Sequence, residues 1–228
     1  MLSFPSPAIP GRAAPVAILS ALSQEQQGLI GLLLHPRKVC HAGREFWLGD
    51  LHGHAVVLAL SRIGKVAAAT TATALIERFG VGRIVFTGVA GGLAEGVNVG
   101  DVVVATDFVQ HDLDVSPLFP RYEVPLYGQA RFASDKALSA LLLAASQAAL
   151  ERQVLEAHGF PDARVHQGLI ASGDRFVCGA GESRQLRELM SDAGHDVLAV
   201  EMECAAVAQV CLDYDVPFVA VRTISDRA

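Results

Sequence analysis

The sequence predicts an α/β protein in which helices cover both faces of a mixed, mostly parallel central sheet. Short apolar runs alternate with segments typical of helices along the 228 residues, except for one early hairpin. Hydrophobic residues make up 51% of the chain and charged residues 18%, which suits a sheet buried on both faces. Since no internal repeat or linker divides this pattern, we expect one three-layer domain over residues 15–228.

Composition excludes several classes of function. The formal net charge of −6 provides no electrostatic basis for binding nucleic acid. No apolar run approaches the ~20 residues that span a bilayer, so no membrane partner is expected. Four cysteines without metal-ligand spacing are typical of reduced thiols in a cytoplasmic protein. Four prolines among the first fifteen residues predict a disordered extension over residues 1–14 rather than a signal peptide.

The first half of the chain is expected to start with a buried strand at 16–21 (VAILSA). Ser23 is placed to cap a following helix over 23–34, with Gln26 as its capping-box partner. A hairpin, a small-residue helix and an apolar strand are expected next, at residues 45–51 paired with 54–61, 66–79 and 83–87.

A glycine-rich segment follows that strand, with five glycines within the thirteen residues 88–100. Their order matches neither the dinucleotide nor the triphosphate fingerprint, so no such site is predicted. Two interpretations stand: a loop that lets backbone approach a ligand closely, or a tight connection between two strands.

The second half is expected to alternate strands and helices, at residues 101–111, 134–156 (a helix capped by Ser134), 164–172, 181–192, 198–201, 204–212 and 217–226. The proline-rich segment 112–131 is long for a connection, which is typical of a functional or interface loop. His111, Asp112 and Asp114 have no further ligands nearby in sequence, so we expect a hydrogen-bonded cap there and no metal.

The most informative stretch runs from Leu198 to Asp226. It reads as a strand, a helix and a second strand, an arrangement that places two parallel strands with their carboxyl ends at one edge. Ligands bind at that edge in open α/β sheets. We therefore expect Glu201, Glu203, Arg222 and Asp226 to converge on one pocket. The alternative is that these charges simply mark strand ends at the protein surface.

Two further residues have both a structural and a functional interpretation. Glu25 lies in the first turn of its helix, where it complements the helix dipole or points into a site at the edge of the first strand. Phe176 follows the carboxyl end of a strand, where it anchors a loop or offers its face to a planar base.

Six ordered motifs together resemble the nucleoside phosphorylase/nucleosidase superfamily, and within it the bacterial 5′-methylthioadenosine/S-adenosylhomocysteine nucleosidases. They are AxxxE at 21–25, SRIGKVAAA at 61–69, TGVAGGL at 87–93, SGDRFV at 172–177, VEMECAAVA at 200–208 and VRTISD at 221–226. The resemblance implies a nucleoside phosphorylase-like fold. It also implies hydrolysis of 5′-substituted adenosines, with 5′-deoxyadenosine and aminofutalosine as further substrates, and no cofactor.

The resemblance implies three catalytic residues. Asp226 is expected to protonate N7 of adenine, since adenine leaves poorly until that nitrogen is protonated. Burial at the end of an apolar strand would favour the protonated acid. Glu25 is expected to activate the attacking water, with Arg222 close by.

The resemblance also implies the substrate contacts. The acid is oriented by Ser225, Glu203 holds the ribose hydroxyls, and Met202 packs against the ribose. Glu201 is either structural or a second ribose contact. Adenine stacks on Phe176 and is read by the backbone of Val177, beside the segment Val89, Ala90 and Gly91. In the family, a homodimer partner completes the 5′ pocket, and Leu118, Phe119 and Pro125 are the candidates for that wall.

Water rather than phosphate is the expected nucleophile. The superfamily's phosphorylases carry arginines in the first strand's loop and just before the glycine-rich loop, with a serine in the latter. This chain has SALSQEQQ (20–27), Phe86 and Val89 at these places, and we expect Arg62 to be structural. The nucleosidases often carry a small hydroxyl residue in place of Val89. A phosphorylase and a non-catalytic nucleoside-binding protein remain as alternatives. The family continues past the position of Asp226 with a lid segment and a helix, which this chain is expected to lack.

Overall fold

A computed structural model describes residues 13–152 and 159–228. The strands in this part of the chain are β1 Val16–Ser20, β2 Leu34–His41, β3 Arg44–Leu51, β4 His54–Leu60, β5 Arg83–Gly92, β6 Val102–Gln110, β7 Arg131–Ala133, β8 Val165–Ser172, β9 Val197–Glu201 and β10 Phe218–Arg227. The helices are α1 Ser23–Ile30, α2 Lys65–Phe79, α3 Lys136–Glu151, α4 Ala180–Asp192 and α5 Cys204–Asp213. All of these strands belong to one sheet.

The sheet is mixed, as predicted, and half of it curls into a closed ring. Strands β10, β6, β8, β9 and β5 pair in that order, and β10 pairs with β5 as well. From β5 the sheet continues outward through β1, β4, β3 and β2. Parallel and antiparallel pairs both occur along this path: β5, for example, pairs parallel with β1 and β10 but antiparallel with β9.

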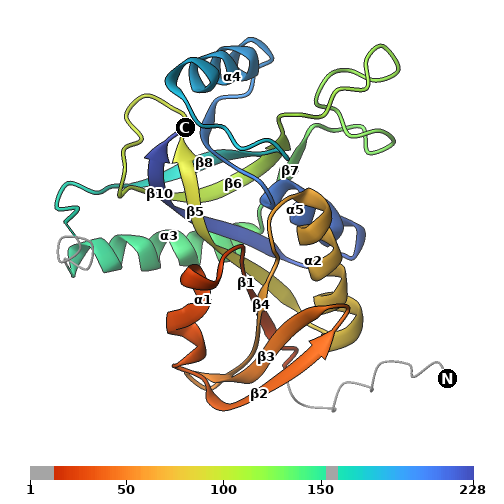
Figure 1. Ribbon diagram of the computed structural model, residues 1–228, viewed down its shortest axis with the longest axis vertical. Helices are drawn as coiled ribbons and strands as arrows, with labels where there is room; N and C mark the ends of the chain where they lie inside the picture. Colours follow the sequence, from red (N-terminus) through yellow and green to blue (C-terminus); the bar gives the residue numbers. More distant parts are fainter. Residues whose placement is uncertain (1–12, 153–158) are drawn as a thin grey trace.

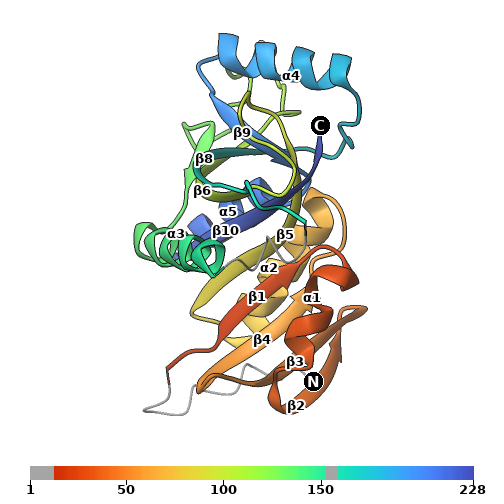
Figure 2. The same ribbon diagram turned by 90° about the vertical axis from the view of Figure 1, so that its left-hand side faces the viewer.

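Helices cover both faces of the sheet (Figures 1 and 2). Helices α1 and α3 lie on one side, against β1, β4 and β5 and against β6, β8 and β10 respectively. Helices α2 and α5 lie on the other side and pack against each other. Helix α4 lies against β9 at the end of the molecule where the chain's last residue is found. None of the helices in the described part of the chain has the length and apolar character that crossing a bilayer requires.

Small side chains explain how closely α2 and α5 approach. Ala68 and Ala72 on α2 and Ala205 and Ala208 on α5 are all buried in the main core. Short side chains let two helix backbones come together, so these positions hold α5 against α2, next to β6, β8 and β10. The helix that follows Glu203 is therefore held against the same core as the sheet.

Several sequence expectations at element ends are wrong. The first helix ends at Ile30 rather than 34, and the unpredicted strand β2 starts at Leu34 and pairs with β3. Leu22, not Ser23, is the N-cap of α1, since Ser23 already lies within the helix. The cap of α3 is Asp135, which accepts a hydrogen bond from the Leu138 N–H at 2.8 Å, so Ser134 is not the cap.

The expected parallel arrangement of the last two strands is also wrong. Strands β9 and β10 are not neighbours: β9 runs antiparallel to β5, whereas β10 runs parallel to β5. Their ends still meet because the sheet closes on itself. Val200 pairs with Gly91 from one side, and Asp226 pairs with Gly91 from the other. The expected extension at 1–14 lies outside the described residues except for positions 13 and 14, as does the expected helix end at Glu156.

Candidate active site

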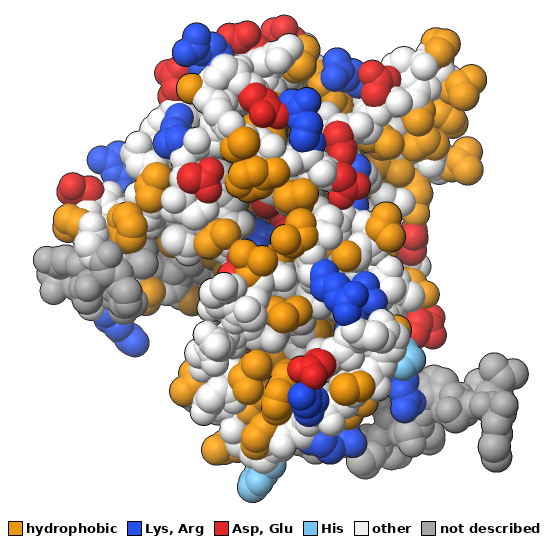
Figure 3. Space-filling model, in the orientation of Figure 1, with side chains coloured by type: hydrophobic (Ala, Val, Ile, Leu, Met, Phe, Trp, Pro, Cys, Tyr) orange, Lys and Arg blue, Asp and Glu red, His pale blue; other side chains and the backbone are white. Residues whose placement is uncertain are grey.

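One pocket lies where β1, β5, β9 and β10 end. Figure 3 shows a hollow on this face, with hydrophobic side chains around it and charged side chains within it. The residues that line the pocket are Ala21, Leu22, Glu25, Ile63, Val89, Ala90, Gly91, Arg175, Phe176, Val177, Val200, Glu201, Met202, Glu203, Ser225 and Asp226.

Glu25 is held by backbone N–H groups from two segments. Its Oε2 accepts hydrogen bonds from Ala21 at 2.7 Å and Leu22 at 2.9 Å, and its Oε1 accepts one from Val89 at 3.0 Å. The carboxylate thus reaches back over the start of α1, as the glutamate of a capping box does. Both earlier interpretations of Glu25 therefore hold at once: it supports the helix start and also lines the pocket.

Gly88 separates Glu25 from Arg222. A Cβ atom at this position would meet the Arg222 guanidinium and would lie 2.7 Å from Glu25 Oε1. Only a residue without a side chain allows both groups to lie against the β5 backbone here.

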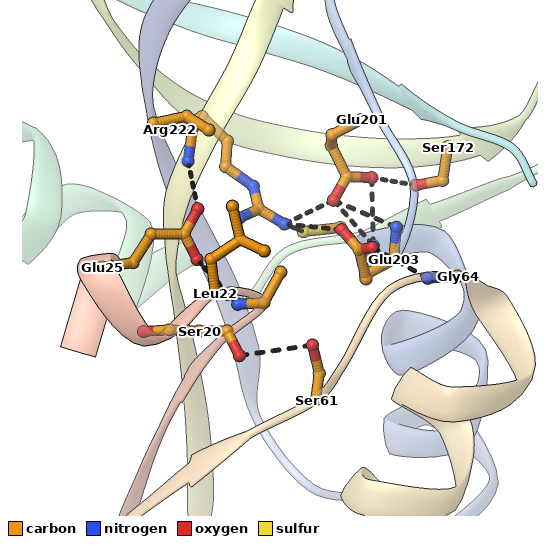
Figure 4. Close-up of polar contacts among 12 residues, drawn as sticks. Ser20, Leu22, Glu25, Ser61, Gly64, Ser172, Glu201, Glu203 and Arg222 are labelled. Atoms are coloured by element: carbon orange, nitrogen blue, oxygen red, sulfur yellow. Dashed lines mark hydrogen bonds and ion pairs between the residues drawn. The ribbon is translucent and has the colours of Figure 1, made fainter. Parts of the chain in front are cut away.

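Glu201 and Arg222 form a buried ion pair below the pocket (Figure 4). Arg222 is fully buried, and its Nη2 donates to Glu201 Oε2. The Ser172 hydroxyl and the Cys204 N–H donate to Glu201 Oε1, the latter at 3.0 Å. The guanidinium also stacks over Phe86, 4.2 Å from the ring centre. These contacts occupy the Glu201 carboxylate, which therefore serves mainly to hold the floor of the site.

Glu203 has fewer partners than Glu201, although only one residue separates them. Its Oε1 accepts a hydrogen bond from the Gly64 N–H at 2.9 Å, and its Oε2 lies 3.7 Å from Arg222 Nη2. Burial, together with the negative charge of Glu201, raises the pKa of Glu203 to about 7. The Arg222 guanidinium faces two buried carboxylates and pairs closely with only one of them, Glu201. The other, Glu203, therefore retains the capacity to accept hydrogen bonds from a ligand.

Arg222 keeps its positive charge although it is buried. Burial alone would lower the pKa of Arg222, but Cys204, Glu201, Glu203 and Glu25 together raise it above its ordinary value. The arginine therefore stays protonated and acts as a fixed cation beneath the pocket.

Asp226 reaches the pocket through an irregularity in β10. The pairing with β5 shifts register between Ile224 and Asp226, as in a β-bulge, which changes the direction of the side chains that follow. The Ser225 hydroxyl donates to Asp226 Oδ2 at 2.6 Å. Gly91 makes room for this strand end, because a Cβ there would lie 3.1 Å from Asp226 Oδ1 and 2.6 Å from Ala228 Cβ.

An apolar side wall completes the pocket. Phe176 is 66% exposed and lines the pocket, while Val177 behind it is buried. An exposed ring at this position anchors no core, so the interpretation as a stacking surface is favoured over that of a loop anchor. Met202 lies between the two glutamates and is half-buried.

The structure brings together most of the residues expected from the sequence. Eleven of them line the same pocket: Glu25, Val89, Ala90, Gly91, Phe176, Val177, Glu201, Met202, Glu203, Ser225 and Asp226. Residues that sequence reasoning missed are Leu22, Ile63, Gly64, Ser172 and Arg175, which line the pocket or donate to its glutamates. Each lies within or next to one of the six motifs, and this position in the sequence could have identified them as candidate site residues.

Two placements differ from expectation. Arg222 lies beneath the pocket and not on its wall, so it can act only through the carboxylates that it holds. The Asp226 side chain is exposed, because it lies past the buried part of β10, and the expected burial is not supplied by that strand. Leu118, Phe119 and Pro125 lie outside this chain's own pocket, on the segment 112–131 that projects away from the sheet (Figure 1), and their expected place is in the pocket of a partner.

The chemistry of the site suits a neutral organic ligand with several hydroxyl groups. In the part of the chain described, no group of three or more His, Cys, Asp or Glu side chains is arranged to hold a metal ion. The pocket instead presents an aromatic face beside carboxylates from three strand ends. This arrangement and the partly closed mixed sheet define a nucleoside phosphorylase-like α/β protein.

Comparisons with known proteins agree with that class. A model of the phosphorylase superfamily matches residues 15–228, and the chain belongs to this superfamily. The 5′-methylthioadenosine/S-adenosylhomocysteine nucleosidase of Bacillus thuringiensis (strain Al Hakam) is 39% identical over 218 residues, covering 93% of this chain and 86% of that protein.

Solved structures are similar over the same extent. The 5′-methylthioadenosine/S-adenosylhomocysteine nucleosidase of Neisseria meningitidis, in complex with methylthio-immucillin-A, has a TM-score of 0.79 and 39% identity, covering 94% of this chain and 86% of that chain. The nucleosidase of Colwellia psychrerythraea 34H, in complex with adenine, has a TM-score of 0.80 and 33% identity, covering 95% and 84% respectively.

Proposed function

We propose that this chain hydrolyses the N-glycosidic bond of 5′-substituted adenosines such as methylthioadenosine and S-adenosylhomocysteine. The products are adenine and the free sugar. The observation that carries the proposal is the placement of Glu25, Glu203 and Asp226 around one pocket beside the exposed ring of Phe176. The similarity to nucleosidases over more than nine-tenths of the chain supports the same reaction.

The base end of the site supplies the proton. Adenine stacks on Phe176, and Asp226, oriented by Ser225, donates a proton to N7. Protonation withdraws electrons from the bond between C1′ and N9, so that bond breaks as the electron pair moves into the purine. A ligand that covers the exposed Asp226 would exclude water from it and favour its protonated form.

The sugar end of the site stabilises the cation and supplies the nucleophile. Breaking the bond leaves an oxocarbenium-like ribose, which the Glu203 and Glu25 carboxylates stabilise electrostatically. Glu203, with its spare acceptor capacity, holds the ribose hydroxyls, and Met202 packs against the ring. A water molecule held by Glu25 attacks C1′ and gives its proton to that carboxylate, which completes the hydrolysis.

The distribution of cations favours water over phosphate as the nucleophile. Arg175 is the basic residue among those that line the pocket, and its guanidinium is paired with Glu182. Arg222 is committed to Glu201, and Arg62 donates to the Gly43 carbonyl outside the pocket. A phosphate dianion beside Glu25 would therefore lack a free cation to hold it.

We further propose that the protein acts as a homodimer in the cytoplasm, within methionine salvage. Leu118 and Leu126 on the projecting loop are 83% and 92% exposed, which is costly unless a partner covers them. In this arrangement Leu118, Phe119 and Pro125 of one protomer would contribute to the 5′ pocket of the other. Sedimentation analysis of the wild-type chain and of a Leu118→Asp, Leu126→Asp variant tests the dimer, and a wild-type monomer would refute it.

The reaction is tested by incubating the protein with methylthioadenosine in phosphate-free buffer and measuring free adenine. Adenine released without phosphate supports hydrolysis. Phosphate-dependent release of a sugar 1-phosphate would instead identify a phosphorylase. Binding of adenosines without turnover would identify a nucleoside-binding protein.

The assignment of the acid has its own test. Asp226→Asn keeps the shape of the side chain but cannot donate an acidic proton, so we expect kcat to fall by at least ~100-fold with the fold intact. The unfolding curve serves as the control, and a variant with a near-normal rate would refute the role of Asp226.

A further inference from the structure

A charged cluster next to the pocket joins three segments that are distant in sequence. It consists of Lys65 at the start of α2, Asp112 just after β6, and Asp174 just after β8. Lys65 Nζ donates to Asp112 Oδ1 at 2.6 Å, and the Asp174 N–H donates to Asp112 Oδ2 at 2.8 Å. The Lys65 N–H donates to Asp174 Oδ1 at 2.7 Å, which closes a ring of hydrogen bonds.

Asp174 serves as the N-terminal cap that α2 lacks in its own sequence. The N-cap residue of α2 is Gly64, which has no side chain to accept a hydrogen bond. The carboxylate of Asp174, more than one hundred residues away in sequence, accepts from the first N–H of the helix instead. A carboxylate at this end also interacts favourably with the helix dipole.

The cluster touches both ends of the proposed substrate site. On the sugar side, Gly64 precedes Lys65 and gives its N–H to Glu203 at 2.9 Å. On the base side, Asp174 lies two residues before Phe176 in the same turn. Gly64 has a φ of 94° and lies so close to Asp174 that a Cβ would be 3.0 Å from Oδ1, so its position depends on that carboxylate.

Asp174 is exposed, but the other two charges in the cluster are partly shielded from solvent, which strengthens their interaction. The side chains of Lys65 and Asp112 are 16% and 27% exposed. Burial would raise the pKa of Asp112, but its hydrogen bonds with Lys65 and with the Asp174 N–H lower it below its ordinary value. Asp112 is therefore ionised and holds its two partners together near neutral pH.

We propose that Lys65, Asp112 and Asp174 are positioning residues that hold the Gly64 N–H against Glu203 and set the turn that carries Phe176. The cluster couples the ribose carboxylate to the base-stacking ring, so that both are in place before a nucleoside binds. This inference rests on the proposed function for its kinetic consequences. The contact between Gly64 and Glu203 can be measured without turnover.

The test compares Asp174→Ala with Asp174→Asn. Alanine removes the acceptor for the Lys65 N–H, whereas asparagine keeps an acceptor oxygen and caps helices about as well as aspartate. We expect Asp174→Ala to lower kcat/KM by about 10–100-fold, mainly through KM, since one hydrogen bond to a charged group is loosened. Asp174→Asn is expected to stay within about threefold of wild type.

A second readout separates positioning from a general loss of structure. The Gly64 N–H stabilises the ionised form of Glu203, so loosening it should raise the pH at which Glu203 titrates by about one pH unit. Carbon-13 NMR of the Glu203 carboxyl measures this without substrate. Glu201, Arg222 and Cys204, which surround Glu203, are unchanged in these variants. The acid limb of the kcat/KM profile should move in the same direction.

Lys65→Met provides a second variant should Asp174→Ala fail to fold. It keeps every backbone donor and removes only the side-chain hydrogen bonds from Lys65 Nζ to Asp112 Oδ1 (2.6 Å) and to Gln110 Oε1 (3.1 Å). The matched control is Glu45→Ala, which breaks the exposed Lys38–Glu45 ion pair (2.9 Å) on the β2–β3 hairpin and should change neither readout. A folded Asp174→Ala or Lys65→Met variant with wild-type kcat/KM and Glu203 titration would overturn the proposal. So would a loss of rate with an unchanged KM and titration. A wild-type chain that releases no adenine would refute the proposed function, whereas the Glu203 titration would still report on the cluster.

Discussion

Replacing Glu203 with glutamine should make the protein more stable and less active at the same time. The carboxylate of Glu203 is buried, faces the negative charge of Glu201, and has a pKa of about 7. Glutamine has nearly the same shape and keeps an acceptor oxygen for the Gly64 N–H. The substitution thus removes the charge and leaves the packing in place.

The expected gain in stability follows from the pKa. The ordinary value for this carboxyl is 4.5, so in the folded protein it binds its proton more tightly than in the unfolded chain. The stability from that proton is fully present below about pH 4.5 and is lost as pH rises to about 7. A difference of about 2.5 pH units corresponds to about 3 kcal/mol, which Glu203→Gln should recover above pH 7.

Urea unfolding of both proteins at pH 8 and pH 5 measures this effect. We expect the variant to be about 3 kcal/mol more stable at pH 8 and less than about 1 kcal/mol more stable at pH 5. With methylthioadenosine, kcat/KM should fall by about 10–100-fold, because hydrogen bonds from the ribose hydroxyls to a charged acceptor are lost. The control Glu45→Gln alters an exposed carboxylate and should change stability by less than about 0.5 kcal/mol.

Three outcomes would refute parts of the reasoning. Equal stability of wild type and Glu203→Gln at pH 8 would mean that the carboxylate carries no penalty from burial. An equal gain at both pH values would mean that the effect arises from packing rather than from charge. A gain in stability with unchanged kcat/KM would remove Glu203 from the ribose site.

Two further substitutions test other parts of the pocket. Gly88→Ala should lower both activity and stability, the latter by about 1–3 kcal/mol, because its Cβ would meet Arg222 and Glu25. Steady-state kinetics and urea unfolding measure the two effects. A fully active, stable variant would contradict the observed packing. Phe176→Ala should raise KM by about 2–10-fold through lost stacking on adenine, with stability unchanged because the ring is largely exposed. An unchanged KM and an unchanged Kd for adenine would exclude Phe176 as the stacking surface.

The sequence alone identified the chemistry of the site well. Short-range patterns show where strands end, and polar residues after an apolar strand are visible without any structure. Glu25, Glu203 and Asp226 were found in this way, and their role as one set came from the resemblance of the ordered motifs. The strand-end pattern and the order of the motifs depend only on which residues follow one another along the chain, so both can be recognised in the sequence.

Local sequence patterns could not distinguish the roles of Glu201 and Glu203; only the resemblance assigned Glu203 to the ribose, and it left two roles open for Glu201. The two residues are separated only by Met202 and have the same side chain. Their difference arises from partners far away: Ser172 and Arg222 occupy Glu201, whereas Glu203 receives the Gly64 N–H. Which carboxylate remains available for a ligand depends on long-range contacts that no local pattern records.

Tertiary structure also decided how the strands meet. The sequence determined that apolar strands end in acids at Glu201 and Asp226, but it suggested two parallel strands side by side. The structure instead closes part of the sheet into a ring, with β9 and β10 on opposite sides of β5 and both paired to Gly91. The physical reason is that strand direction and neighbours are set by hydrogen bonds between distant segments and by burial of both faces of the sheet. The sequence therefore determines which residue types can line the pocket, and the closure of the sheet determines how these residues are arranged around the pocket.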